Sequence, residues 1–557
     1  MNTAKPPAEN PPMTDLAFLW HMHQPDYRHP ENGQFVLPWV LLHAIKDYAD
    51  MAGHLERHPH IKCTVNFVPV LLDQVEDYCD QFATRHWRDP LLAVAASGHA
   101  DDEQRRWLLD MAFRGHAATL IEPFAPYRRL RDIREFMRQH GASGHTYLGD
   151  AYFSDLACWM LLAWSGETLR RANGIIPRLM AKGEDFDAGE REALLATLGE
   201  VVRQIIPRYR ALAASGQVEI SCTPSHHPLA PLMLDFASAR EAWHDCRLPS
   251  APAYPGGRTR VAAHLATARA SHERRFGQAA AGLWPAEGAL SMPFLGQIGE
   301  AGFTWAATSH SVLRNSAGPA ASPYRPWQAP DSPLTLFFRD ERLSDLIGFE
   351  YSRWHGRDAA RHFVAEAERI AGAEPGALIP VFLDGENAWE YYPYNAWYFF
   401  DDLYAALGQA PGIRTVTLSE AAARHAARRP PLAKLTAGSW VYGTFSTWIG
   451  HPDKNRAWEL LCEAKLSADR VLANPQLAAD ERQAILDRLA VCESSDWFWW
   501  FGDDNPAPSV VCFDQLFRAN LKALYGLLNL PAPARLNEAI SRGGGEAEAG
   551  GTMRRAG

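Results

Sequence analysis

Short apolar runs that end in polar residues alternate with long stretches of helical periodicity along most of this chain. The predicted strands are residues 16–23, 62–69, 217–224, 281–287, 303–310, 377–386 and 413–420, with 334–340 as a candidate eighth. Together with helices expected at residues 101–114 and 358–371, this alternation is typical of a parallel α/β sheet, either open or closed. A barrel fits this number of strands. In such barrels the chemistry collects at the C-terminal ends of the strands, and the polar residues in or near the predicted ends are His21, His23, Asn66, Glu219, Glu287, His310, Asp384 and Glu420.

Two long sections show helical periodicity instead of strand-like runs. The first, residues 70–216, is predicted to be a mostly helical insertion between strands, and Pro207 is expected to kink or divide its last helix. The second, near the C-terminus, is predicted to form a smaller all-α domain. The expected organisation is a disordered lead-in at 1–14, a barrel at 15–423, a helical domain at 424–532 and a disordered tail at 533–557.

Charge and composition narrow the class of partner. The 557 residues carry a formal charge of -10, which argues against a nucleic-acid partner because phosphate contacts need clustered Lys and Arg. No apolar run approaches the length of a membrane span, so no membrane partner is expected. The eight cysteines are dispersed without a CxxC pair, and the first residues lack the features of a signal peptide. These features favour a cytoplasmic enzyme with reduced thiols, and they leave its oligomeric state open.

Two carboxylates share one unusual context. Glu287 in GLWPAEG and Asp384 in FLDGEN each follow an apolar run and precede a glycine, so both are expected where a strand stops at the barrel mouth. A lone Asp or Glu more often caps a helix or forms an ion pair. A pair of carboxyl groups in such a mouth, however, suits cleavage of a glycosidic bond, in which one protonates the leaving oxygen and the other attacks or stabilises the sugar cation.

Tryptophan usage supports a sugar ligand. The chain has 19 Trp against 17 Tyr, and many of the Trp flank carboxylates or histidines. Large rings also fill large cores, but their recurrence beside charged motifs favours rings that line a groove and stack on flat apolar faces.

Histidines lie beside the first and third predicted strands. His21 and His23 are two residues apart, so on a strand they face the same side. That spacing also suits a metal pair, and a metal-dependent hydrolase is an alternative. Because the chain has no HExxH motif and no nearby cysteine, the favoured interpretation is that they donate hydrogen bonds to sugar hydroxyls or to a carboxylate. His226 and His227 follow another strand end, where prolines fix a loop that presents one of them inward.

Five segments follow one another along the chain: HMHQP, GQVEISCTPSHHPLAPL, GLWPAEG, FLDGENAWEYYP and GSWVYGTFSTWIGHPDKNRAWELL. In this order they resemble the motifs of glycoside hydrolase family 57, the α-amylase and amylopullulanase group that acts on α-glucans, and SDWFWWFGDD is similar to the amylopullulanase branch. The resemblance covers residues 16–528.

The resemblance implies a fold and a set of roles. The fold is a (β/α)7 barrel with helical insertions and a C-terminal all-α domain, and the mechanism is retaining, with Glu287 as nucleophile and Asp384 as general acid/base. It needs no catalytic metal and no cofactor. The expected substrate-binding positions are His21, His23, His227, Trp284, Glu386, Trp389, Tyr391, Trp448 and Asp453. Of these, Glu386 is expected to support the acid by like-charge repulsion, and Trp389, Tyr391 and Tyr392 to offer rings along which a glucan lies.

The predicted activity is hydrolysis of α-1,4-glucans, with α-1,6 branches as a further substrate, through a covalent glycosyl-enzyme. A 4-α-glucanotransferase is a close rival, because another sugar can intercept the same intermediate in place of water. A non-catalytic glucan-binding protein is the rival from another class.

Overall fold

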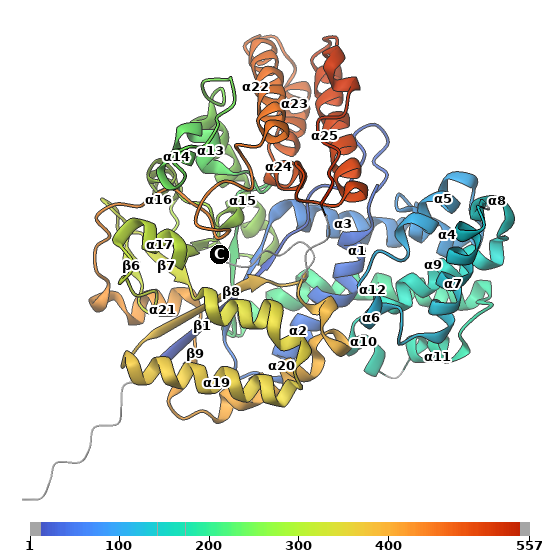
Figure 1. Cartoon of the computed structure of the whole chain (residues 1–557), viewed down its shortest axis with the longest axis horizontal. Coiled ribbons are helices and arrows are strands. Elements are labelled where there is room, and N and C mark those ends of the chain that lie inside the picture. The colour runs from blue at the N-terminus through green and yellow to red at the C-terminus, as the bar shows by residue number, and fades with distance from the viewer. Residues whose placement is uncertain (1–12, 142, 173, 546–557) are drawn as a thin grey trace, which may run out of the picture.

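The computed structural model describes residues 13–141, 143–172 and 174–545, and its centre is a sheet of parallel strands (Figure 1). Neighbouring strands follow the order β7-β5-β4-β3-β2-β1-β8, and the backbone N–H of Asp340 at the end of β7 donates to the carbonyl of Pro380 in β8 at 2.7 Å. This contact brings the two edges of the sheet together, so the strands form a seven-stranded (β/α) barrel. They are β1 (Thr14–Met22), β2 (Cys63–Phe67), β3 (Val218–Cys222), β4 (Gly282–Leu283), β5 (Trp305–Ser309), β7 (Thr335–Arg339) and β8 (Leu378–Asp384).

The longest strands are apolar without alternation because both of their faces are covered. Every residue of β1 and of β8 is buried, as is typical of parallel strands with side chains packed inside the barrel and helices outside. Their register pairs His21 with Asp384, so the last residues of both strands end side by side at one rim.

The seventh strand of the barrel is not the segment that the sequence predicted. The candidate eighth strand, β7, is a barrel strand, whereas β9 (Ile413–Thr415) is a three-residue strand that pairs only with the start of β1. The run ends there because Thr417 caps the helix α21 (Leu418–Arg424) in a capping box with Glu420. A further short strand, β6 (Trp327–Gln328), pairs antiparallel with β7 and was not predicted.

A group of helices separates β2 from β3, where a helical insertion was predicted. In Figure 1 most of these helices lie to the right of the barrel. Pro207 lies inside α12, which continues through it to Ala214, so this helix is not divided. The helices are α3 (Pro69–Thr84), α4 (Pro90–Ser97), α5 (Asp102–Met111), α6 (Ala117–Leu120), α7 (Ala125–Gln139), α8 (Gly144–Tyr147), α9 (Asp150–Ala163), α10 (Glu167–Arg171), α11 (Ile175–Lys182) and α12 (Ala188–Ala214).

Other helices connect the remaining barrel strands and surround the barrel. They are α1 (Trp39–His43), α2 (Ala49–Arg57), α13 (Ala230–Leu234), α14 (Ala239–Ala242), α15 (Gly257–Phe276), α16 (Met292–Glu300), α17 (His310–Ala317), α18 (Glu341–Asp345), α19 (Gly356–Ala373) and α20 (Trp397–Gln409). No helix within the described ranges is long and apolar enough to cross a bilayer.

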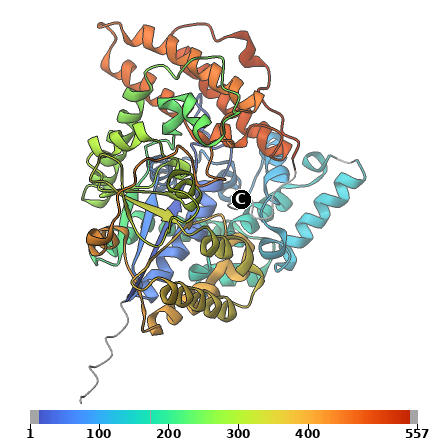
Figure 2. The same cartoon turned by 60° about the vertical axis from the view of Figure 1, so that its left-hand side comes forward.

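The C-terminal part of the chain is helical and lies above the barrel in both views (Figures 1 and 2). It contains α22 (Pro452–Leu472), α23 (Ala479–Cys492), α24 (Ser495–Trp500) and α25 (Ala507–Leu527). Of the segments predicted to be disordered, residues 1–12 and 546–557 lie outside the described residues. The part of the predicted tail that is described contains buried Leu536 and Ile540, so it packs against the helices.

Candidate active site

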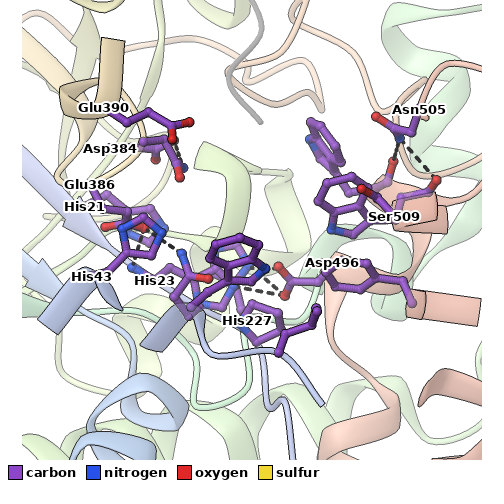
Figure 3. Close-up of a pocket in the computed structure, with 18 of the residues that line it drawn as sticks. His21, His23, His43, His227, Asp384, Glu386, Glu390, Asp496, Asn505 and Ser509 are labelled. Atoms are coloured by element: carbon purple, nitrogen blue, oxygen red, sulfur yellow. Dashed lines mark hydrogen bonds and ion pairs between the residues drawn. The ribbon is translucent and has the colours of Figure 1, made fainter. Parts of the chain in front are cut away.

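The C-terminal ends of the strands open into a cavity of ≈ 330 Å³. Figure 3 shows its two sides, with strand-end residues such as His21 and Asp384 facing Asp496 and Ser509 from the C-terminal helices. Aromatic rings extend the walls: Trp499, Trp500 and Phe513 on the side of the C-terminal helices, and Trp39, Trp164 and Tyr391 around the rest of the rim. The cavity therefore combines several carboxylates with stacking surfaces, as a sugar site requires.

Glu287 lies four residues after the end of the short strand β4, in a 3-10 turn. Its backbone is left-handed, with φ 58° and ψ 23°, a conformation that costs a non-glycine residue on the order of 1–3 kcal/mol and is found most often at functional sites. The side chain Oε2 accepts a hydrogen bond from Trp440 Nε1 at 3.0 Å, and the backbone N–H of Trp440 donates to the Glu287 carbonyl. Burial raises the pKa of Glu287 to about 8, and the charges of Asp496 and Asp384 add to this rise. The hydrogen bond from Trp440 acts in the opposite direction and lowers the pKa.

Asp384 is the last residue of β8 and is buried. Its Oδ2 accepts a hydrogen bond from Asn387 Nδ2 at 3.0 Å. Burial raises the pKa of Asp384 to about 6, and the hydrogen bond from Asn387 and the nearby charges of His23 and Arg339 oppose this rise. The glycine after it has a packing role, since a Cβ on Gly385 would lie 2.2 Å from Met22 Sδ.

Three histidines form a stack along the floor of the cavity. The rings of His23 and His227 lie 3.7 Å apart at 22°, and His21 stacks on both at 5.3 to 5.8 Å. His21 Nδ1 donates to Asn66 Oδ1 at 2.7 Å, and His23 Nε2 contacts both carboxylate oxygens of Asp496 at 2.9 and 3.0 Å. Burial lowers the pKa of His21 to about 3 and that of His227 well below its ordinary value, so these two rings are neutral at neutral pH.

One group of side chains has the composition of a metal site. His23, His227 and Asp496 each offer a ligand atom, and these atoms lie within 4.8 Å of one another. An imidazole binds a metal in the plane of its ring, and two rings stacked nearly parallel do not direct their nitrogens to one point. In the observed arrangement His23 and Asp496 therefore form a hydrogen-bonded pair beside the stacked ring of His227, and metal binding would require one ring to turn.

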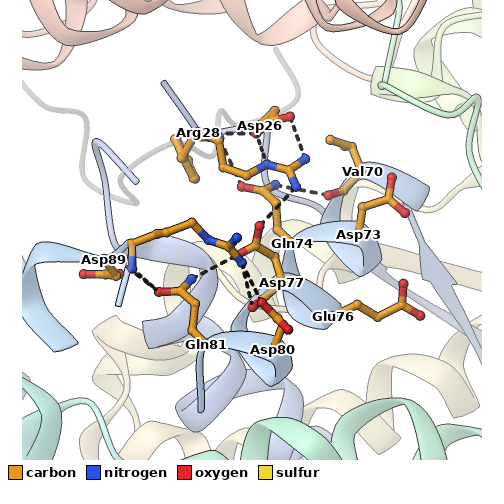
Figure 4. Close-up of polar contacts among 12 residues, drawn as sticks. Asp26, Arg28, Val70, Asp73, Gln74, Glu76, Asp77, Asp80, Gln81 and Asp89 are labelled. Carbon is orange, nitrogen blue, oxygen red and sulfur yellow. Dashed lines mark hydrogen bonds and ion pairs between the residues drawn. The ribbon is translucent and has the colours of Figure 1, made fainter. Parts of the chain in front are cut away.

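Glu386 ties the loop after β8 to the loop after β1. Its Oε1 accepts the backbone N–H of His23 at 3.2 Å, and burial followed by the charge of Asp384 raises its pKa well above the ordinary value. The loop after β1 is held in turn by α3, where Gln74 accepts the backbone N–H of Tyr27 and donates to the carbonyl of Pro25. Figure 4 shows Gln74 donating to the carbonyl of Val70 on the same helix, and the neighbouring pair of Arg28 with Asp26. The polar face of α3 thus fixes residues that line the cavity.

The structure brings most of the predicted site residues together. Lining the cavity are Glu287, Asp384, His21, His23, His227, Glu386 and Tyr391. Trp284 is fully buried beneath them, 6.1 Å from the His21 ring and 5.1 Å from the Trp440 ring. It supports the floor and does not line the cavity.

Three predicted contacts lie elsewhere. Trp389 is buried against Trp20 and Phe400, and its indole N–H donates to the carbonyl of Gly385. Trp448 is also fully buried, and Asp453 lines a separate depression with Arg456. In contrast to the expectation, these side chains do not face the cavity; for the two Trp residues, burial of a large apolar ring in the core prevails.

Some strand-end assignments also change. Glu219 is the second residue of β3, and its carboxylate accepts hydrogen bonds from the backbone and hydroxyl of Ser419, at the opposite end of the barrel. Glu420 belongs to the capping box of α21 at that same end, and His310 begins α17 without lining the cavity.

The residues whose roles were missed come from outside the barrel strands. Trp440 follows β9, and Asp496 is in α24. Both residues belong to segments that resemble family 57 motifs, GSWVYG and SDWFWW. Nothing in the spacing of these segments along the sequence indicates that Trp440 contacts Glu287 or that Asp496 contacts His23.

The family model for glycosyl hydrolase family 57 matches residues 17–433. No curated protein matches the sequence.

Among solved structures, a family 57 branching enzyme from Thermococcus kodakaraensis has a TM-score of 0.56 at 15% identity, covering 92% of this chain and 90% of its own. A branching enzyme of the same type from Pyrococcus horikoshii has a TM-score of 0.55 at 16% identity, covering 96% and 98%. An α-amylase from Thermotoga maritima has a TM-score of 0.57 at 13% identity, covering 93% of each chain. At these identities the likeness is one of fold.

Proposed function

The chain belongs to glycosyl hydrolase family 57, and on that premise we propose that it is a retaining enzyme acting on α-1,4-glucans through a covalent glycosyl-enzyme. One observation carries the proposal: Glu287 and Asp384, from the ends of β4 and β8, line the same aromatic cavity. The branching enzymes and the amylase that share the fold support an α-glucan as the substrate.

The proposed reaction has two steps. Asp384 donates its proton to the glycosidic oxygen while Glu287 attacks the anomeric carbon, so the bond to the leaving sugar breaks and an ester forms. Asp384, now ionised, takes a proton from a water or a sugar hydroxyl, which attacks the anomeric carbon and releases Glu287. Arg339, whose Nε donates to the carbonyl of Phe382, lines the cavity and favours the ionised form of Asp384 in this second step.

The raised pKa values decide how the pair shares its protons. With pKa values of about 8 for Glu287 and about 6 for Asp384, the pair holds one proton between these pH values. Because the pKa of Glu287 lies above that of Asp384, the shared proton favours Glu287, and the reactive arrangement, with Glu287 ionised and Asp384 protonated, is the minor form of the free enzyme. Contacts that favour the Glu287 anion, above all the Trp440 N–H, therefore set the population that reacts.

A glucanotransferase is the second candidate function, and the aromatic walls of the cavity support it. Trp499 and Trp500 from the C-terminal helices and Trp39 and Trp164 from the barrel side give rings on more than one side of the carboxyl pair. Such walls hold an acceptor sugar and exclude water from the ester, and transfer then competes with hydrolysis.

Chromatography of the products from maltoheptaose tests the proposal and separates the candidates. Shorter sugars alone indicate hydrolysis, and longer sugars that appear beside them indicate transfer. Branched glucan products that a debranching enzyme shortens indicate α-1,6 transfer. A Glu287→Gln control must show none of these, and a wild-type enzyme inactive on linear and branched glucans alike would refute the proposal.

The proposed compartment is the cytoplasm. All eight cysteines are free thiols in the structure, and most of them are buried, which suits a reducing environment.

A further inference from the structure

A buried carboxylate outside the cavity links the C-terminal helices to the barrel. Glu493 follows α23 and is fully buried. Its Oε1 accepts from Arg260 Nε at 2.8 Å, and its Oε2 accepts from Arg260 Nη2 at 2.7 Å and from His264 Nε2 at 2.7 Å. Tyr254 donates its hydroxyl to the same carboxylate. Burial opposes the charge, but Arg260 and His264 outweigh it and lower the pKa of Glu493 to about 2, so it is ionised.

The residues that follow Glu493 touch the histidines of the cavity. Ser494 forms an antiparallel bridge with Pro228, and the backbone N–H of Ser495 donates to the carbonyl of His227 at 2.9 Å. The Ser495 hydroxyl pairs with His227 Nδ1 at 2.9 Å. Asp496, one residue further, is hydrogen-bonded to His23 Nε2 at 2.9 and 3.0 Å. Ser495 and Asp496 thus contact two of the histidines of the cavity floor, and Ser494 pairs with the residue that follows His227.

The same barrel helix also holds the loop that carries His227. His264 on α15 uses its Nε2 for Glu493 and its Nδ1 for the hydroxyl of Ser225 at 2.8 Å, and its carbonyl accepts the backbone N–H of Ser225. The segment 493–496 and the loop 225–228 are therefore fixed to one helix through one side chain, so a shift of either would displace His227 and Asp496 together.

We propose that Glu493 is a positioning residue of the active site: anchored by Arg260 and His264, it holds Ser495 and Asp496 against His227 and His23. Asp496 in turn is a cavity carboxylate that orients the His23 ring next to the catalytic pair. The C-terminal helices thereby complete the site, and the barrel alone would leave His23 without this partner. The kinetic test of this inference, a double-mutant cycle, rests on the proposed function. The structural test, hydrogen–deuterium exchange, rests on the geometry alone.

A double-mutant cycle tests whether Glu493 acts through Asp496. Glu493→Gln keeps the size of the side chain and removes its charge, and it is expected to lower kcat for maltoheptaose at least about tenfold with little change in KM. Asp496→Asn is expected to lower kcat by a similar factor. If Glu493 acts through Asp496, the double variant is no slower than Asp496→Asn alone, because the carboxylate that Glu493 positions is already absent. Multiplicative losses would overturn the positioning role and leave only a general loss of stability.

Asp469→Asn is the matched control within the C-terminal helices. Asp469 pairs with Lys465 on α22 and does not line the cavity, so losing this ion pair is expected to leave kcat unchanged. If Glu493→Gln does not fold, His264→Gln replaces it in the cycle, since it breaks the same link while leaving Arg260 paired with Glu493.

Hydrogen–deuterium exchange of the unliganded protein gives a readout that needs no turnover. Glu493→Gln is expected to speed exchange in the peptides that contain residues 494–500 and 225–229 together, while Asp469→Asn leaves both unchanged. Unchanged exchange in both segments would refute the anchor even if the proposed function holds. A wild-type enzyme inactive on all glucans would refute the proposed function and leave this measurement valid.

Discussion

The hydrogen bond from Trp440 to Glu287 makes a quantitative prediction about the pH dependence of catalysis. Trp440 Nε1 lies 3.0 Å from Glu287 Oε2, and the backbone N–H of Trp440 also holds the Glu287 carbonyl. Trp440→Phe removes the indole donor while keeping an aromatic ring and the backbone contact. A hydrogen bond to a charged group contributes about 1.5–3 kcal/mol, which corresponds to an increase of about 1–2 units in the pKa of Glu287.

The expected result follows from the shared proton. In the wild type, kcat/KM is expected to show a bell-shaped profile with limbs near the pKa values of about 6 and about 8. In Trp440→Phe the alkaline limb moves up by about 1–2 units, and the plateau of kcat/KM falls about 10- to 100-fold because the reactive arrangement becomes rarer. The acidic limb, which reports Asp384, stays in place.

The assay is kcat/KM for maltoheptaose across the pH range, with thermal unfolding measured for each variant. Trp284→Phe is the matched control, because Trp284 lies in edge contact with Trp440 and its own indole N–H has no hydrogen-bond partner among the described residues. Its alkaline limb is expected to stay where the wild type has it. A Trp440→Phe enzyme with an unshifted limb would show that this hydrogen bond does not control the ionisation of Glu287.

Three further predictions concern the carboxyl pair, the metal alternative and the aromatic walls. Glu287→Gln is expected to abolish turnover. Because the folded-state pKa of Glu287 is raised, folding of the wild type takes up a proton between about pH 5 and about pH 8, and wild-type stability falls as the pH rises through this range. The variant lacks this group, so it is expected to melt at a higher temperature than the wild type at about pH 8 but not at about pH 5. Equal melting temperatures at both pH values would contradict this. Incubation with EDTA is expected to leave activity unchanged, whereas a loss restored by a divalent ion would show that His23, His227 and Asp496 rearrange to bind metal. Trp500→Ala is expected to raise KM for maltoheptaose about tenfold, since it removes a cavity ring stacked on Phe513, while Trp389→Phe changes stability more than KM because Trp389 is buried in the core.

The positions of several cavity residues could be predicted from the sequence because the ends of the strands of a parallel barrel can be identified in it. A strand buried on both faces is a continuous apolar run, so the residue at which it stops can be identified, as for His21 and Asp384. Glu287 could be predicted for the same reason, although β4 has only two paired residues. β9 is shorter than the predicted strand because Thr417 and Glu420 form a capping box, a sequence pattern that marks the end of the strand and the start of a helix.

The remaining features could not be predicted because they depend on tertiary placement. Trp389 and Trp500 both stand beside carboxylates in the sequence, yet one is buried beneath the loop after β8 and the other lines the cavity. Asp496 is 473 residues from its partner His23, and local periodicity carries no information about contacts at that distance. The role of Glu493 also depends on a pairing between two helices that only the folded chain brings together.

The division between barrel and C-terminal helices bears on which reaction the enzyme favours. In the proposed mechanism Glu287 and Asp384 form and resolve the glycosyl ester in either reaction, so they do not choose between water and a sugar as acceptor. The choice depends on what reaches the anomeric carbon while Asp384 is ionised, and the walls that control access come partly from Trp499, Trp500 and Asp496 beyond the barrel. Changes in that segment can therefore alter the product while leaving both carboxyl groups in place. The barrel carries the proposed catalytic carboxyl groups, and we infer that the helical wall influences which acceptor reaches them.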